Sequence, residues 1–242
     1  MQALIRQLKK CKYLVFFDLE GTQFTHEMIA IGSLVVPVDA EGNIIGEAEE
    51  FKRYVFCQGG IGEYVRKLTG ISKKMLRENG ISFADTLKEW KESLGEKFSS
   101  CLFVSFGNHD YRILSQSLQF NPLADRSITD YIFSHCFDFS AFLAQYIKDE
   151  KMNPYSLLNY LHVFHQTPVP NEHDPLVDSK NLLLLYQAFL QHPEIVKEEY
   201  QKILSHMRHF PEPVREAIQR LLQGKNVTSK QFQKWVENYL TK

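Results

Sequence analysis

The sequence predicts an α/β fold in which helices cover a mixed central β-sheet, followed by a C-terminal helical extension. The chain of 242 residues begins with three strand-like stretches in succession, and helical patterns then alternate with a further strand pattern. A meander followed by alternating strands and helices is typical of layered folds whose sheet has both antiparallel and parallel strands. The apolar fraction of 44% and the aromatic fraction of 13% agree with a chain that buries a core.

Four strands are expected. Residues 14–17, "LVFF", are continuously apolar, as in a buried central strand. Residues 27–38 form the second pattern, which ends at the turn sequence "DAEGN". Residues 44–56 alternate loosely and carry charge, which favours a strand near the edge of the sheet. The short apolar run "CLFVSF" at 101–106 predicts the fourth strand.

Helical spacing is clearest in residues 81–98, where Phe83, Leu87 and Trp90 recur every three or four positions. Ser82 is a candidate N-cap for this helix. Further helical patterns cover residues 110–119, 140–150, 156–164 and 177–191. Residues 127–139 are ambiguous, with a short strand as one interpretation.

A domain boundary is expected near residue 190. Residues 191–242 carry nine Lys/Arg against six Asp/Glu, a net charge of +3, whereas residues 1–190 carry 19 against 23, a net charge of −4. The later segment also reads as two or three amphipathic helices. We therefore expect a main domain at 1–190 and a helical extension at 191–242. Its basic residues are Lys197, Lys202, Arg208, Arg215, Arg220, Lys225, Lys230, Lys234 and Lys242.

Overall composition narrows the class of protein. The net charge of −1 gives no general attraction for a polyanion, so any nucleic-acid contact must come from a local patch. The four cysteines are scattered without zinc-like spacing, which favours a reduced, cytoplasmic protein. No apolar run resembles a signal peptide or a membrane span, so we expect no membrane partner. The sequence leaves the oligomeric state open.

Two carboxylates follow the first strand directly. Asp18 and Glu20 are two positions apart, so in an extended chain both side chains lie on one face. Two uncompensated negative charges at the end of a buried strand are costly, and a bound cation would relieve them. The alternative is a pair of solvated acids in a loop.

Two further acidic positions stand out. Asp110 follows the strand pattern at 101–106 and begins a helix, and Asp178 lies in the first turn of a late helix, five residues after His173. Carboxylates at helix starts usually act as caps or as partners of the helix dipole, and His173 alone reads equally well as an exposed loop residue. In this order, however, the four acids and the histidine form a joint pattern.

This pattern resembles a known family. "FFDLEGT", "SFGNHDYRIL" and "HDPLVDSKNLLLLY" resemble the three motifs of the DEDDh exonucleases, and "RKLTGIS" resembles a segment that they carry between the first two motifs. These enzymes form the DnaQ-like branch of the ribonuclease H-like superfamily, and the nearest branch contains the histone-mRNA and small-RNA 3′ exonucleases and the bacterial KapD proteins. The resemblance covers about residues 12–190.

The resemblance implies a ribonuclease H-like three-layer fold and a metal-dependent 3′–5′ exonuclease. Such an enzyme would release 5′-mononucleotides from single-stranded nucleic acid with a free 3′ end, with RNA weakly preferred over DNA. It would use two divalent cations, Mg²⁺ or Mn²⁺. By the family pattern Asp18 would bridge both metals, Glu20 and Asp178 would complete one site, and Asp110 would hold the other. His173 would be the general base.

The resemblance also implies substrate contacts. Leu19 and Thr22 would lie beside the terminal nucleotide, and Phe24 and His109 are candidates to stack on a base. Phe24 could equally belong to the core. Gly21 departs from the family pattern, and so does His109, which occupies a position where related RNA enzymes often have an aromatic residue.

Two rival interpretations remain. The His-Asp dipeptides at 109–110 and 173–174 are compatible with an HD-type phosphohydrolase, which would be entirely helical. The second rival is a catalytically silent nuclease-like domain that only binds nucleic acid.

Overall fold

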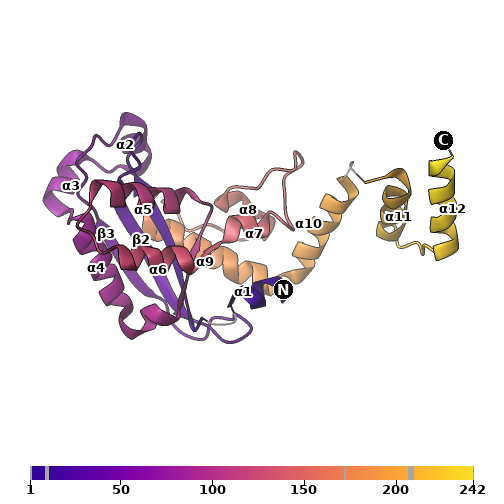
Figure 1. The fold of residues 1–242 in the computed structure, drawn as a ribbon, viewed down its shortest axis with the longest axis horizontal. Helices are drawn as coiled ribbons and strands as arrows, with labels where there is room; N and C mark the ends of the chain where they lie inside the picture. Colours follow the sequence, from indigo (N-terminus) through magenta and orange to yellow (C-terminus); the bar gives the residue numbers. More distant parts are fainter. Residues whose placement is uncertain (1, 9–10, 172, 207–209, 242) are drawn as a thin grey trace. The chain divides into compact units, whose positions relative to one another are not determined.

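The computed structural model describes residues 2–8, 11–171, 173–206 and 210–241 (Figure 1). Its centre is a five-stranded sheet in the order β3-β2-β1-β4-β5. The strands are β1 (Tyr13–Gly21), β2 (Met28–Pro37), β3 (Glu49–Tyr54), β4 (Cys101–Ser105) and β5 (Cys136–Asp138). β1 to β3 form an antiparallel meander, whereas β4 is parallel to β1 and β5 is parallel to β4. The predicted mixed sheet is confirmed, with β3 at one edge.

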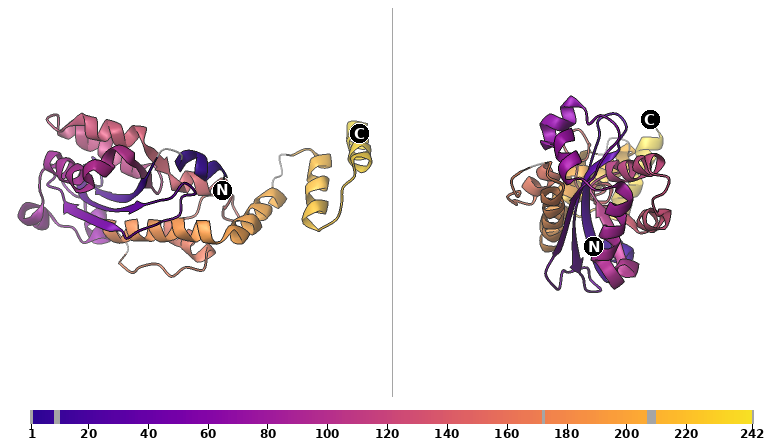
Figure 2. Two further views of the ribbon diagram at one scale, coloured as in Figure 1. Left: turned by 90° about the horizontal axis from the view of Figure 1, so that it is seen from below. Right: turned by 90° about the vertical axis from the view of Figure 1, so that its left-hand side faces the viewer.

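Helices cover both faces of this sheet (Figure 2). The helices of the first part of the chain are α1 (Gln2–Leu8), α2 (Glu63–Thr69), α3 (Lys73–Asn79), α4 (Phe83–Leu94), α5 (His109–Phe120), α6 (Arg126–Ser134), α7 (Phe139–Leu143), α8 (Leu157–Val163) and α9 (Pro175–Gln191). A short 3₁₀ helix spans Gly95–Ser100. Ser82 caps α4 as predicted, because its side chain accepts a hydrogen bond from the Asp85 N–H.

The side chains of β1 point alternately into the two helical layers that cover the sheet. Val15, Phe17 and Leu19 pack with buried side chains of α4, α5 and α6. On the opposite face, the ring of Phe16 makes an edge-on contact with Tyr186 of α9, at 5.3 Å between ring centres. Even-numbered residues of β1 therefore face α9, which matters for the carboxylates at the end of this strand.

The structure resolves one ambiguous local prediction and corrects another. Residues 127–139 are mostly the helix α6, and only the three residues of β5 are a strand. α6 is amphipathic and buries Ile128 and Ile132 in the core, as expected for a helix that packs on the sheet. The helix expected at 140–150 ends at Leu143, where the chain turns and the Leu143 carbonyl accepts the N–H groups of two later residues.

The chain forms two compact units: Met1–Phe142 with Ser156–Gln191, and Leu143–Tyr155 with His192–Lys242. The sequence did not predict that 143–155 group with the C-terminal segment, and the assignment of 1–190 and 191–242 to two domains stays a prediction. The second unit contains α10 (Pro193–His206), α11 (Glu212–Leu222) and α12 (Ser229–Leu240). Arg208 and Lys242 of the predicted basic set lie outside the described residues.

None of the described helices combines the length and the apolar character that a membrane crossing requires.

Candidate active site

β1 delivers the first two carboxylates to the end of the sheet. Asp18 pairs with Gly32 of β2 and Glu20 pairs with Ala30, and the register shifts immediately after Glu20. Such an irregularity ends regular pairing and allows the chain to turn away. Both acids are therefore held on rigid backbone, on the face of the sheet that carries α9.

Gly32 allows α9 to begin directly against the sheet. A Cβ atom at Gly32 would lie 2.1 Å from the Leu176 nitrogen and 2.2 Å from the Pro175 carbonyl carbon. The Ser179 hydroxyl also donates to the Gly32 carbonyl oxygen at 2.9 Å. This close approach, which a side chain would prevent, brings the first turn of α9 next to the carboxylates of β1.

α5 contributes Asp110, which is 4% exposed. Its Oδ1 accepts the N–H of Leu19 at 2.9 Å, and Leu19 stands between Asp18 and Glu20. The carboxylate is thus bonded to the strand itself and does not act only as a partner of the helix dipole.

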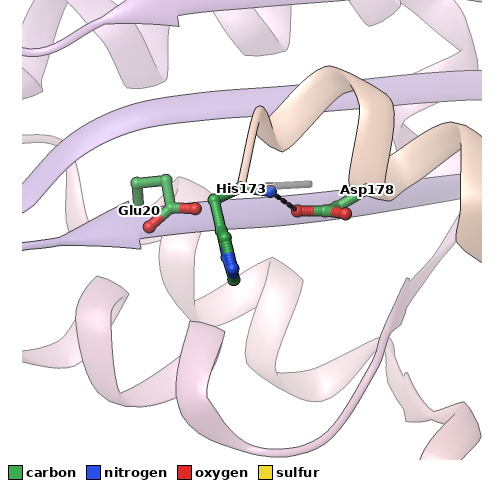
Figure 3. A group of neighbouring side chains, drawn as sticks. All are labelled: Glu20, His173 and Asp178. Carbon is green, nitrogen blue, oxygen red and sulfur yellow. Dashed lines mark hydrogen bonds between the residues drawn. The ribbon is translucent and has the colours of Figure 1, made fainter. Parts of the chain in front are cut away.

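The start of α9 supplies His173 and Asp178. Asp178 Oδ2 accepts the backbone N–H of His173 at 2.9 Å, and ligand atoms of Glu20, His173 and Asp178 all lie within 4.8 Å of one another. Figure 3 shows His173 between the two carboxylate groups. Because His173 is half-buried beside these acids, the interpretation as an exposed loop residue is wrong.

The carboxylates repel one another. Burial raises the pKa of Asp18 well above its usual range, and the charges of Asp110 and Glu20 raise it further. Burial, with the charges of Asp178 and Asp110, raises the pKa of Glu20 to about 8. Burial also raises the pKa of Asp110 to about 7, although the Leu19 N–H opposes this shift. These carboxyl groups therefore tend to hold protons near neutral pH. A hard divalent cation such as Mg²⁺ or Mn²⁺, bound to their oxygens, would stabilise the ionised forms.

A second group of contacts fixes the loop that carries His173. Lys52 Nζ of β3 donates to Asp174 Oδ2 at 2.5 Å, and Asp174 Oδ1 accepts the Leu176 N–H at 3.1 Å. Farther along α9, the buried side chain of Asn181 makes hydrogen bonds to both the N–H and the C=O of Val169. Sequence reasoning did not find Lys52 or Asn181, because nothing in the sequence pairs them with a loop so far along the chain.

The predicted substrate residues fall into two groups. Leu19 is 3% exposed and packs in the core, so only its backbone can face a ligand, and Thr22 is buried with its hydroxyl bonded to Thr25 and to the Glu27 N–H. Phe24, in contrast, is 77% exposed, so the alternative that it belongs to the core is wrong. His109 is also exposed.

His26 is a residue of this region that the sequence did not point to. Its ring makes an edge-on contact with the His109 ring, at 5.4 Å between ring centres. Partial desolvation of the rings, together with the charge of Arg112, lowers the pKa of both histidines. The pair therefore favours the neutral form at neutral pH, and it presents two aromatic faces near the end of β1.

The site conflicts with one rival interpretation. An HD-type phosphohydrolase would be all-helical, whereas both His-Asp dipeptides lie beside a mixed five-stranded sheet. His109–Asp110 opens a helix that follows a parallel strand, and His173–Asp174 precedes α9. That interpretation is wrong for this chain.

Comparison with known proteins agrees with the motifs. The family model described as "Exonuclease", RNase_T, matches residues 15–186. Among solved structures, a full-length 3′-exonuclease is similar with a TM-score of 0.59 at 16% identity, covering 76% of this chain and 62% of that one. A 3′-exonuclease described in 3′-end recognition of the histone mRNA stem-loop gives 0.58 at 17% identity, covering 75% and 64%. The chain thus spans less than two thirds of the length of these two proteins.

A third solved structure is matched over most of its own length. The nuclease domain of 3′hExo, described as a DEDDh family member bound to rAMP, gives a TM-score of 0.58 at 19% identity, covering 75% of this chain and 92% of that one. No curated protein matches the chain. The family match takes in most of the chain, including all four carboxylates and His173. The protein therefore belongs to the RNase_T exonuclease family.

Proposed function

We propose that the protein is a metal-dependent 3′–5′ exonuclease that releases 5′-mononucleotides from single-stranded nucleic acid. The observation that carries this proposal is the convergence of Asp18, Glu20, Asp110 and Asp178 from three separate elements, beside the half-buried His173. A module that only binds nucleic acid has no need for four acids whose mutual repulsion weakens the fold and repels phosphate.

The residues present fit two divalent cations. Asp18 would lie between them, Glu20 and Asp178 would complete one site, and Asp110 would contribute to the other with the oxygen that does not accept the Leu19 N–H. Bound there, the cations would activate a water molecule and neutralise the charge that develops on the phosphate.

His173 would accept the proton of the attacking water. Its backbone N–H is bonded to Asp178, which holds the residue beside the carboxylates. Water adds to phosphorus, the bond from phosphorus to the 3′ oxygen of the preceding nucleotide breaks, and that oxygen leaves. The products are a 5′-mononucleotide and a chain shorter by one nucleotide. A neutral imidazole suits this role near pH 7.

RNA is the substrate that we favour. One similar structure is described as bound to rAMP, and another is described in 3′-end recognition of the histone mRNA stem-loop.

Digestion of matched oligonucleotides tests the proposal. Single- and double-stranded RNA and DNA, labelled at either end, should be incubated with Mg²⁺ or Mn²⁺ beside the Asp18→Ala variant. We expect a 3′ label to appear at once as a mononucleotide and a 5′ label to shift progressively, with single-stranded RNA degraded fastest. Internal cleavage, or equal release by the Asp18→Ala variant, would contradict the proposal.

A further inference from the structure

We propose that the surface formed by α2 and α3 binds the single-stranded nucleic acid upstream of the scissile nucleotide, through Tyr64, Arg66 and Arg77. This inference rests on the proposed function for its substrate and adds a binding site on the main unit of the chain. It depends on where the two helices are attached, on which of their side chains are exposed, and on which of their charges are free.

The attachment fixes α2 beside the active site. The turn that follows Glu20 is bonded to the segment that precedes and begins α2: the Gln23 N–H donates to the Ile61 carbonyl at 2.9 Å, and the Tyr64 N–H donates to Gln23 Oε1 at 3.3 Å. The buried Glu27 carboxylate, on the same turn, accepts the N–H groups of residues 58 and 59 at 2.7 and 3.0 Å. Substrate leaving the end of β1 therefore meets α2 at a fixed position.

Aromatic side chains are exposed along this path. Phe24 of the turn is 77% exposed, Tyr64 at the start of α2 is 65% exposed, and Phe56 of the connecting loop is 45% exposed. Large aromatic groups left in water are candidates for a binding surface. Bases of a single strand stack on such rings without regard to sequence.

Positive charge accompanies these rings. Residues 61–80 carry five Lys/Arg against two Asp/Glu, within a main domain whose net charge is −4. Lys67 pairs with Glu63 at 2.8 Å and Lys74 pairs with Glu78 at 3.8 Å, so these two lysines are partly neutralised.

Three cations remain, and one of them is structural. Lys73 Nζ donates to backbone carbonyls of the loop before α2, including those of Cys57 and Gln58, and so holds that loop in place. Within the parts of the chain that the structure describes, Arg66 and Arg77 take part in no ion pair. Arg66 also lines an open pocket of about 400 Å³.

This combination favours one class of ligand. An acidic peptide would be recognised by the cations but would leave the exposed rings unused, whereas a single strand offers phosphates to Arg66 and Arg77 and bases to Tyr64. The continuity of the surface with the end of β1 gives the strand a direction, with its 3′ terminus at the carboxylates.

Binding measurements that do not depend on catalysis test the inference. The affinity of a labelled single-stranded 12-nucleotide RNA should be measured by fluorescence anisotropy at several KCl concentrations, with Ca²⁺ in place of Mg²⁺. We expect the Arg66→Gln/Arg77→Gln double variant to weaken binding about tenfold and to lower the slope of log K against log salt by about 1.4, because two phosphate contacts are lost. Tyr64→Ala should weaken binding at least about fivefold without changing this slope.

Arg126→Gln is the matched control. Arg126 is an exposed arginine at the start of α6, which follows the C-terminal end of α5, whereas Asp110 lies at the N-terminal end of α5. Circular dichroism checks that each variant is folded. Unchanged affinity and slope in the double variant, or an equal loss in the control, would overturn the inference and leave the surface to another partner.

A dinucleotide, too short to reach α3, separates this inference from the proposed function. A wild-type protein that binds the 12-nucleotide RNA through these residues but hydrolyses neither substrate would refute the proposed function while supporting this binding surface.

Discussion

Replacement of Glu20 by glutamine should stabilise the metal-free protein in a pH-dependent way. The pKa of Glu20 rises from an ordinary value of 4.5 to about 8 in the folded protein. Between these two values the folded state holds a proton that the unfolded chain releases, so the free energy of unfolding falls as pH rises through this window. One pKa unit corresponds to about 1.4 kcal/mol, so the penalty at pH 7 is at most about 3 kcal/mol.

Glutamine has nearly the same shape and no charge, so the Glu20→Gln variant should escape this penalty. We expect its free energy of unfolding in EDTA to match the wild type near pH 4 and to exceed it by up to about 3 kcal/mol at pH 7, which corresponds to several degrees in Tm. Urea unfolding between pH 4 and pH 8 measures this difference.

Added Mg²⁺ should reverse the order, because the wild type gains binding energy that the variant largely lacks. Equal stability of the two proteins in EDTA at every pH would refute the reasoning, because it would show that the acids neither repel one another nor suffer from burial.

The other predictions concern activity. Asp18→Ala should abolish hydrolysis with either metal while circular dichroism stays unchanged, and substantial Mg²⁺-dependent activity in the purified variant would contradict the ligand assignment. His173→Ala should lower kcat about 10²-fold or more with metal binding close to wild type by calorimetry; loss of metal affinity with kcat retained would make His173 a ligand instead. Lys52→Met removes the ion pair that holds the loop at Asp174, so kcat should fall several-fold at constant KM and recover in Lys52→Arg; an unchanged kcat would show that the pair does not position the loop. Deletion of residues 195–242 should weaken binding of long oligonucleotides and flatten its salt dependence without affecting a dinucleotide, whereas an unchanged salt slope would leave the segment a structural role only.

The sequence predicts those parts of the fold whose pattern is local. Residues 14–17 of β1 are continuously apolar because both faces of the strand are covered there, and α4 shows its period and its cap because it lies on the surface of the sheet. α2 and α3 were not predicted, since each has only seven residues and is too short for a periodic signal. The position of α2 is set by hydrogen bonds to the turn that follows Glu20, about 40 residues earlier in the chain.

The candidate site, too, can be predicted from the sequence only where the pattern is local. The spacing of Asp18 and Glu20 predicts a shared face, because a strand imposes a period of two. The bond from the Leu19 N–H to Asp110 joins residues 91 positions apart, and the ion pair of Lys52 with Asp174 joins residues 122 apart. Contacts of this kind depend on how layers of the fold meet, which no local pattern records.

The activity depends on the absence of a side chain at Gly32, a residue that takes no part in the reaction itself. The gap between β2 at Gly32 and the start of α9 has the width of a bare backbone. A single added methyl group, as in Gly32→Ala, would move the start of α9 outward and separate Asp178 from Glu20. Such a protein would keep every proposed ligand and its general base. Its sequence would still carry all the motifs of a nuclease, although the two halves of the site could no longer share a cation.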